Sequence, residues 1–267
     1  MEIPAKRWYQ AVKERNSRRQ FNSKIIEKRK IKIKKLNNLI EALNNDIEGL
    51  RIILIQKEVE EIFTGIIGSY GKITGAPAYL AFIGREDISN MEEKIGYGGE
   101  AVILEATALE LGSCWVSGTF KSDKVLADLN LNQKEKLYAI SPIGYPEAKP
   151  TISERVLKKV IKSKKRLDLK KLIVNKNNLE KIPEWMITAL ETARLAPSAL
   201  NRQPWRFKIE GNSIIIQLDN KEKNEERSKN IDCGIAMLHL EIGAMKAGFT
   251  GKWQYLKGDK VAIFSLD

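Results

Sequence analysis

The sequence predicts an α+β protein built of two halves. Two long apolar stretches, at residues 98–112 and 234–248, predict central helices, since apolar positions nearly surround the first of them. Short apolar runs bounded by glycine or polar residues predict buried strands. Part of the order of the first half, helix, strand, apolar helix and strand, recurs in the second. These observations predict that both halves contain helices and strands.

In the first half, a short helix leads into a basic turn, and a second helix precedes the first strand. The most apolar helix is expected to begin near Gly98 and Gly99 and to end at Gly112, since glycine favours a helix C-terminus. Glycine residues punctuate the stretch between the first two strands. The other helices are expected at residues 8–14 and 31–43, and the strands at residues 50–55, 78–83 and 137–143.

The second half repeats part of this order in a shorter span. Helices are expected at residues 185–195 and 234–248, and strands at residues 214–218 and 260–266. A shift of 136 positions aligns Gly98, Glu105, Ala108 and Gly112 with Gly234, Glu241, Ala244 and Gly248. The four matches fit either a duplication or a chance recurrence of common helix residues. The expected divisions are a first half at residues 1–150, a basic connector at 151–180 and a second half at 181–267.

Composition indicates a folded protein without a membrane segment. Hydrophobic residues make up 43% of the 267 residues, and no stretch resembles a signal peptide or spans a bilayer, so a cytoplasmic location is expected. The net charge of +12 raises the alternative of a nucleic-acid or membrane-surface partner. The lysine runs contain no interleaved aromatic residues, which favours solvated faces and connectors, and we expect neither partner.

Four further residues have both a functional and a structural interpretation. Cys114 could be a nucleophile, but its place between an apolar helix and a tryptophan favours a small core residue. His239, the only histidine, lies inside an apolar helix, where packing is favoured over metal binding. Trp205 and Trp253 could line a substrate pocket or serve packing alone. The two cysteines show no spacing typical of a disulfide framework or zinc site, and no metal is expected.

The basic turn RNSRRQF, at residues 15–21, is suited to an anion. Its guanidinium groups and short hydroxyl can each donate to phosphate oxygens. A solvated basic turn, or a regulatory or localisation patch, is the alternative for this segment taken alone.

A second segment, APSALNRQPW at residues 196–205, combines two prolines with serine, asparagine and glutamine. The prolines restrict the backbone, so such a loop can present hydroxyl and amide groups to the polar edge of a flat ring. A turn that merely ends a helix would not account for this density of polar side chains or for the closing tryptophan.

Together these two segments resemble the nitroreductase family of flavin enzymes. The segment LGSCWVSG, at residues 111–118, is similar to the Gly-x-Cys-Trp region of that family, and SPIGYP, at residues 141–146, to its Ile-Gly-Tyr-Pro strand end. The order differs, because the Pro-Ser-Asn loop appears only in the second half. The chain thus resembles two family subunits fused into one. The implied fold is nitroreductase-like, with central antiparallel-rich sheets flanked by helices and two halves related by pseudo-twofold symmetry.

The resemblance implies one flavin mononucleotide (FMN) bound by residues from both halves. The basic turn, with Arg155 as a third partner, would hold the phosphate, and Arg19 would lie near the pyrimidine side of the ring. The late loop would line the ring or ribityl chain, and the Cys-Trp segment would offer backbone groups to the reactive ring nitrogen. The implied cofactor-binding residues are Arg15, Ser17, Arg19, Trp115, Ser117, Gly118, Arg155, Pro197, Ser198, Ala199 and Asn201.

The implied activity is hydride transfer from NADH or NADPH, through FMN, to a nitro compound, quinone or similar small acceptor. The cofactor carries the chemistry, so no side chain is assigned as a catalytic acid or base. The sequence contains neither a dinucleotide-binding glycine motif nor a Walker loop. A monomer with an internal pseudo-dimer is expected. Alternatives are a flavin store or sensor without turnover and, on charge alone, a basic nucleic-acid-binding protein.

Overall fold

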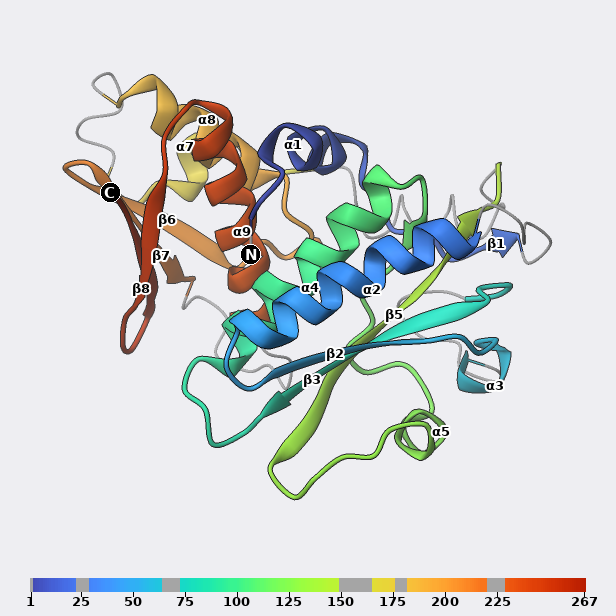
Figure 1. Ribbon diagram of the computed structural model, residues 1–267. Helices are drawn as coiled ribbons and strands as arrows, with labels where there is room; N and C mark the ends of the chain where they lie inside the picture. Colours follow the sequence, from blue (N-terminus) through green and yellow to red (C-terminus); the bar gives the residue numbers. More distant parts are fainter. Residues whose placement is uncertain (1, 23–28, 64–72, 149–164, 176–181, 220–228) are drawn as a thin grey trace. The chain divides into compact units, whose positions relative to one another are not determined.

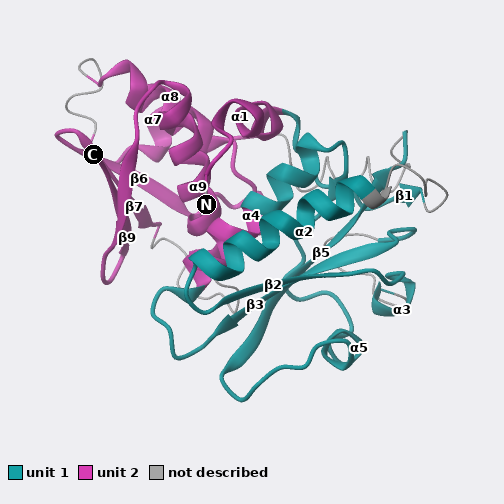
Figure 2. Ribbon diagram, in the orientation of Figure 1, with its two compact units in different colours: residues 1, 14–91, 101–163 teal, residues 2–13, 92–100, 164–267 magenta. Residues whose placement is uncertain are grey.

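The computed structural model describes residues 2–22, 29–63, 73–148, 165–175, 182–219 and 229–267 (Figure 1). The chain divides into two compact units (Figure 2). Unit 1 comprises residues 1, 14–91 and 101–163, and unit 2 comprises residues 2–13, 92–100 and 164–267. Each unit is therefore built from segments that are separated in the sequence.

Unit 1 contains an antiparallel sheet centred on two long strands, β3 (Ala78–Arg85) and β5 (Glu135–Pro146). Strand β2 (Leu50–Ile55) pairs with β3, whereas the short strands β1 (Phe21–Asn22) and β4 (Gly112–Ser113) pair with β5. All but the last residue of β3 are buried, because helices and loops cover both of its faces. The apolar run that predicts this strand therefore corresponds to a central strand.

The helices of unit 1 are α2 (Arg29–Asp46), α3 (Glu60–Phe63), α5 (Ser122–Ala127) and the second half of α4 (Met91–Ala108). Helix α2 is attached to the edge strand β2 through Asn44, whose amide group accepts from the N–H of Ile52 at 2.7 Å and donates to its carbonyl at 2.9 Å. These bonds satisfy backbone groups that an edge strand would otherwise leave unpaired.

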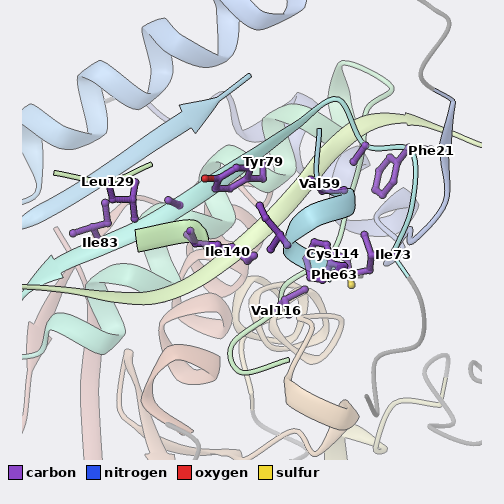
Figure 3. Packing of buried hydrophobic residues seen from close by; sticks show 14 residues of the cluster. Phe21, Val59, Phe63, Ile73, Tyr79, Ile83, Cys114, Val116, Leu129 and Ile140 are labelled. Atoms are coloured by element: carbon purple, nitrogen blue, oxygen red, sulfur yellow. The ribbon is translucent and has the colours of Figure 1, made fainter. Parts of the chain in front are cut away.

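A hydrophobic core fills the other side of this sheet (Figure 3). Alternate residues of β3, Tyr79, Ala81 and Ile83, pack with residues of α3 and α5. Cys114 and Val116, which follow β4, belong to the same cluster. The segment after β4 is thus anchored by core packing, which fixes the position of its neighbours Trp115 and Ser117.

Unit 2 contains a second antiparallel sheet, in the order β6 (Trp205–Glu210), β7 (Ser213–Leu218), β9 (Lys260–Leu266) and β8 (Gly251–Tyr255). A two-residue turn joins β6 to β7, and Gly211 adopts the positive φ of 57° that such turns require. The helices of unit 2 are α1 (Ala5–Glu14), α7 (Leu169–Leu172), α8 (Glu184–Arg194), α9 (Lys229–Lys246) and residues 92–100 of α4.

Two glycines let α4 and α9 approach closely within unit 2. A Cβ atom on Gly96 would lie 2.0 Å from the carbonyl oxygen of Ile231, and one on Gly234 would lie 2.0 Å from that of Glu93. Real Cβ atoms do not come this close to a backbone oxygen, so only glycine fits at either position. The two contacts are reciprocal.

The two sheets share one topology, and the two central helices share one length. Orders β2-β3-β5-β4 and β6-β7-β9-β8 correspond strand by strand, with α4 or α9 between the second and third strands in sequence. The bounds of α9 lie 138 residues after those of α4 (229 minus 91, and 246 minus 108). Both helices are followed by a left-handed residue, Glu110 at φ 62° and Gly248 at φ 89°. The internal repeat therefore has a shift of 138, not the 136 expected from the sequence.

Several expected boundaries are wrong for a physical reason. Helix α4 begins at Met91, seven residues before Gly98, because Gly96 is retained for close packing and does not interrupt the helix. Gly112 is the first residue of β4 and does not end the helix. An added Cβ there would lie 3.0 Å from the side chain of Arg18, so this glycine serves a close approach. Strands β6 and β8, and the short helix α3, were not predicted.

Candidate functional site

The predicted site residues fall into two sets, one in each unit, and Arg155 lies outside the described residues. The first set belongs to unit 1 and consists of the basic turn and the Cys-Trp segment. The second set belongs to unit 2 and consists of the loop at residues 196–205. A set of convergent polar groups without protein partners is typical of a ligand site.

The basic turn is held in an extended form beside the Cys-Trp segment. Ser17 forms a parallel bridge with Ser113, and the N–H of Arg18 donates to the carbonyl of Ser113 at 2.8 Å. The N–H of Thr74 donates to the carbonyl of Arg19 at 3.0 Å on the same turn. The structure therefore brings together two of the segments that the sequence assigns to FMN. Ser17 pairs with Ser113, which precedes Trp115 by two residues.

Arg19 is a buried cation without an acidic partner among the described residues. Arg19 is 7% exposed, and its Nε atom has no hydrogen-bond partner among the described residues. A buried guanidinium in this state is costly unless an anion or another strong acceptor binds it. The group therefore fits a site for an anionic or oxygen-rich ligand, as the phosphate and the pyrimidine oxygens of FMN are.

The Cys-Trp segment stays in the core through Val116, with Trp115 half-buried, and becomes exposed at Ser117. The Trp115 ring stacks on Phe82, with ring centroids 4.4 Å apart. Ser117 and Gly118 are exposed, and a Cβ on Gly118 would meet nothing within 4 Å. The buried hydroxyl of Thr119 has no partner among the described residues. Backbone groups at residues 117–118 are thus accessible, and a free hydroxyl follows them.

In unit 2, the loop at residues 196–205 has an uncommon backbone. Leu200, Asn201 and Gln203 all have positive φ, at 52°, 58° and 54°. Each such residue that is not glycine costs on the order of 1 kcal/mol, so other contacts must hold the loop in this form. The hydroxyl of Ser198 accepts from the N–H of Gln203 at 2.9 Å and closes the loop on itself.

Asp232, in the first turn of α9, forms hydrogen bonds with the backbone of the same loop. Both of its carboxylate oxygens lie 3.2 Å from the N–H of Ala199, which donates to them. Burial raises the pKa of Asp232 to about 7, an effect that the bond from Ala199 and the charge of Arg202 oppose. The sequence interpretation missed Asp232, although an acid in the first turn of an apolar helix is a recognisable signal.

A short segment before α7 binds the polar side chains of the loop. Arg166 donates to Oδ1 of Asn201 at 2.5 Å, and Nδ2 of Asn201 donates to the carbonyl of Lys165 at 2.8 Å. The N–H of Leu167 donates to Oε1 of Gln203 at 2.8 Å. Arg166 and Gln203 are further residues of this site that the sequence interpretation did not assign.

The other candidate residues serve packing. Cys114 lies in the hydrophobic core of unit 1, and its N–H donates to Ser141 Oγ at 3.1 Å. His239 is fully buried, with Nε2 3.0 Å from Glu100 Oε1. Trp205 is fully buried, while Trp253 is half-buried and packs on Phe264 with ring centroids 5.1 Å apart.

Two classes of site are absent from the part of the chain that the structure describes. In that part, no three histidine, cysteine, aspartate or glutamate residues group in a way that could hold a metal ion. Nor does any helix of these ranges have the length and apolarity needed to cross a bilayer.

Comparison with known proteins assigns the family. The family described as "Putative TM nitroreductase" matches residues 7–244. A Thermotoga maritima protein described as a "putative nitroreductase" is similar over 97% of this chain and 93% of its own, at 23% identity and a TM-score of 0.59. An FMN-dependent nitroreductase of Clostridium difficile is similar over 63% of this chain and 98% of its own, at 22% identity and a TM-score of 0.45. No curated protein matches the chain.

The family match covers most of the chain, and the Thermotoga maritima structure shows the same fold at nearly full length in both proteins. The resemblance carried by the four motifs and the predicted α+β fold are both confirmed. The chain belongs to the nitroreductase family and has the nitroreductase fold.

Proposed function

We propose that this chain is an FMN-dependent oxidoreductase that passes hydride from NADH or NADPH to a small acceptor such as a nitro compound or a quinone. The observation that carries the proposal is Arg19, a buried guanidinium whose Nε lacks a partner within the described residues. It lies in the turn at residues 15–21, which hydrogen bonds position beside the Cys-Trp segment. Membership of the nitroreductase family supports the same reading.

The basic turn would bind the phosphate end of the cofactor. Arg15 and Ser17 are both half-buried, so their guanidinium and hydroxyl groups can donate to phosphate oxygens without full exposure to water. Arg19 would neutralise negative charge on the pyrimidine side of the ring. A positive charge held there before reduction favours the anionic product, since no reorganisation is needed when the charge develops.

The remaining assigned residues would orient the ring. Accessible backbone groups at Ser117 and Gly118 would face its reactive nitrogen. Pro197, Ser198, Ala199 and Asn201 would line the ring or the ribityl chain. When bound, FMN supplies the two-electron acceptor and donor that hydride transfer requires. The protein then has to hold it, orient the nicotinamide and the acceptor, and exclude water.

Flavin content and turnover of the purified protein test this proposal. We expect a yellow protein that retains FMN through gel filtration and oxidises NADH or NADPH when a nitroaromatic compound or a quinone is added. Anaerobic mixing with each nicotinamide should bleach the flavin absorbance before any acceptor is present. Colourless protein that takes up no FMN would contradict the proposal. Tight FMN binding without nicotinamide oxidation over a broad acceptor panel would instead indicate a flavin store or sensor.

A further inference from the structure

We propose that Asp232 is a positioning residue for FMN: its carboxylate holds the N–H of Ala199 and fixes the loop at residues 196–205 in the form that contacts the cofactor. The inference rests on the proposed function and adds to it a residue outside the four family motifs. It concerns only residues of unit 2.

The first argument is the geometry around Ala199. The two oxygens of Asp232 are both 3.2 Å from the Ala199 nitrogen, so the carboxylate straddles a single N–H. Asp232 is 7% exposed, and a carboxylate so deeply buried is expensive unless it makes specific bonds. Its place in the first turn of α9 lowers that cost, because the N-terminal end of a helix favours negative charge.

The second argument is what the bond maintains. Ala199 directly precedes Leu200 and Asn201, two residues in the left-handed region. Left-handed residues other than glycine are strained, and strain of this kind persists only where surrounding contacts impose it. Ser198 fixes the far side of the loop through Gln203, and Asp232 fixes the near side through Ala199. Without Asp232 the loop keeps its bonds at Asn201 and Gln203 but loses the one at Ala199, directly before the left-handed residues.

The third argument is an internal comparison. At the shift of 138 that relates α4 to α9, the counterpart of Asp232 is Lys94. The first half also lacks the loop, since α2 ends at Asp46 and β2 begins at Leu50. The acid therefore occurs in the half that has the loop, and a base replaces it in the half that does not. A role confined to helix packing would not couple the two differences.

The charged and titratable groups around Asp232 make its effect depend on pH. The positive charge of Arg202, in the loop, favours the carboxylate form of Asp232. Cys233 is a neutral neighbour, because burial raises the pKa of its thiol well above the usual value. The charges of Glu93 and Arg206 also act on this thiol. Burial raises the pKa of Asp232 to about 7. A carboxylate accepts more strongly than a neutral carboxyl group, so acidification through this range should loosen the hold on Ala199.

The test compares FMN dissociation constants of Asp232→Ala, Asp232→Asn and the matched control Lys94→Ala with that of the wild-type protein. We expect Asp232→Ala to weaken FMN binding about tenfold or more, the effect of losing one charge-assisted hydrogen bond. Asp232→Asn keeps a neutral acceptor and should show an intermediate value. Lys94→Ala should bind FMN as the wild type does.

Two further readouts separate positioning from general instability. Between about pH 8 and about pH 6, the affinity of the wild type for FMN should fall more than that of Asp232→Asn. Ionisation of the FMN phosphate affects both proteins equally, whereas only the wild type has the carboxyl group of Asp232. Hydrogen exchange in the cofactor-free protein should be faster across residues 196–205 in Asp232→Ala, with the exchange of β7 and β9 unchanged.

The proposal is overturned if Asp232→Ala binds FMN as tightly as the wild type, or if Asp232→Asn keeps the wild-type pH profile. If Asp232→Ala fails to fold, the profile of Asp232→Asn decides. Wild-type protein that binds no FMN overturns the proposed function as well, so the two failures can be told apart.

Discussion

Arg19 carries a positive charge at a position that water hardly reaches. Its Nε makes no hydrogen bond to the described part of the chain, and burial of a guanidinium nitrogen without such a bond costs free energy. We expect Arg19→Met to stabilise the cofactor-free protein, by on the order of 1 kcal/mol, because the cost of burial disappears. The same variant should gain less thermal stability than the wild type when FMN is added. Calorimetry with and without FMN measures both effects, and equal FMN-induced shifts in melting temperature would contradict the assignment.

The resemblance to the nitroreductase family assigns both Arg15, in unit 1, and Asn201, in unit 2, to FMN binding. Arg15→Ala should weaken FMN binding about 10-fold to 100-fold through loss of charge-assisted bonds to the phosphate. Asn201→Ala should weaken binding or change turnover, because it removes an amide that also positions Arg166. Flavin fluorescence titration measures both affinities.

Arg18→Ala is the matched control for the basic turn, since Arg18 lies in the same turn but outside the residues assigned to FMN. It should retain wild-type affinity. If Asn201→Ala left both affinity and turnover unchanged, the contribution of the loop at residues 196–205 to this FMN site would be refuted.

Asp232 also predicts a dependence of stability on pH. Its folded pKa of about 7 lies above the usual value, so folding favours the protonated form. The associated stability is complete below about pH 4 and is lost as the pH rises to about 7, by at most about 1.4 kcal/mol per pH unit. Asp232→Asn, which resembles the protonated form, should therefore gain stability relative to the wild type across this range and show no further gain above it. Denaturant unfolding at several pH values tests this, and a constant difference would contradict the raised pKa.

Among the helices, α4 and α9 depend on glycine at their closest approach within unit 2. In both Gly96→Ala and Gly234→Ala, the new methyl group would lie 2.0 Å from a backbone oxygen of the other helix. We expect each to lower stability by about 1 to 3 kcal/mol, since overpacking outweighs the better helix propensity of alanine. Gly118→Ala is the control, because its added Cβ meets nothing within 4 Å. Thermal unfolding measures all three, and unchanged melting of the first two variants would show that the helices move apart at little cost.

At the level of elements, the sequence predicted best where apolar runs were continuous. Strands β2, β3, β7 and β9 are strongly apolar and were expected close to their observed bounds. Strand β6 alternates buried and half-buried residues, with Arg206 and Lys208 between apolar neighbours, so its signal is present in the sequence, although no element was predicted at residues 206–210. The start of α4 was missed because its first turns are polar and contain a glycine that only the partner helix explains.

For the site, motif spacing identified segments but not their supports. The basic turn and the Cys-Trp segment were each recognised, and the hydrogen bond from Arg18 to Ser113, with the bridge between Ser17 and Ser113, places them side by side. The roles of Asp232 and Arg166 could not be deduced, because each acts on the loop at residues 196–205 from more than 30 positions away in the sequence. The position of Asp232 near a helix start is a local signal, but its contact with Ala199 depends on the fold.

For the molecule as a whole, we expect one FMN per chain. At the shift of 138, Trp115 corresponds to Trp253, but the exposed Ser117 and Gly118 correspond to Tyr255 and Leu256. The indole of Trp253 and the hydroxyl of Tyr97 both donate to Oε2 of Glu241, each at 2.8 Å. Side chains thus occupy the counterpart of the Cys-Trp segment in the second half. The first half lacks a counterpart of the loop at residues 196–205.

The ratio of FMN absorbance to protein concentration, measured after gel filtration of protein saturated with FMN, gives this stoichiometry. A value near one agrees with a single site. A value near two would refute the loss of the second site.

The division of α4 between the two units bears on whether the chain can be expressed as two separate fragments. Residues 92–100 supply the helical surface against which Gly234 packs, although they are encoded far upstream of residues 164–267, which form most of unit 2. A gene interrupted at residues 149–164 would therefore yield a C-terminal polypeptide that lacks α1 and the part of α4 that belongs to unit 2. Such fragments would have to be produced together, as complementing pieces, to regain a folded protein.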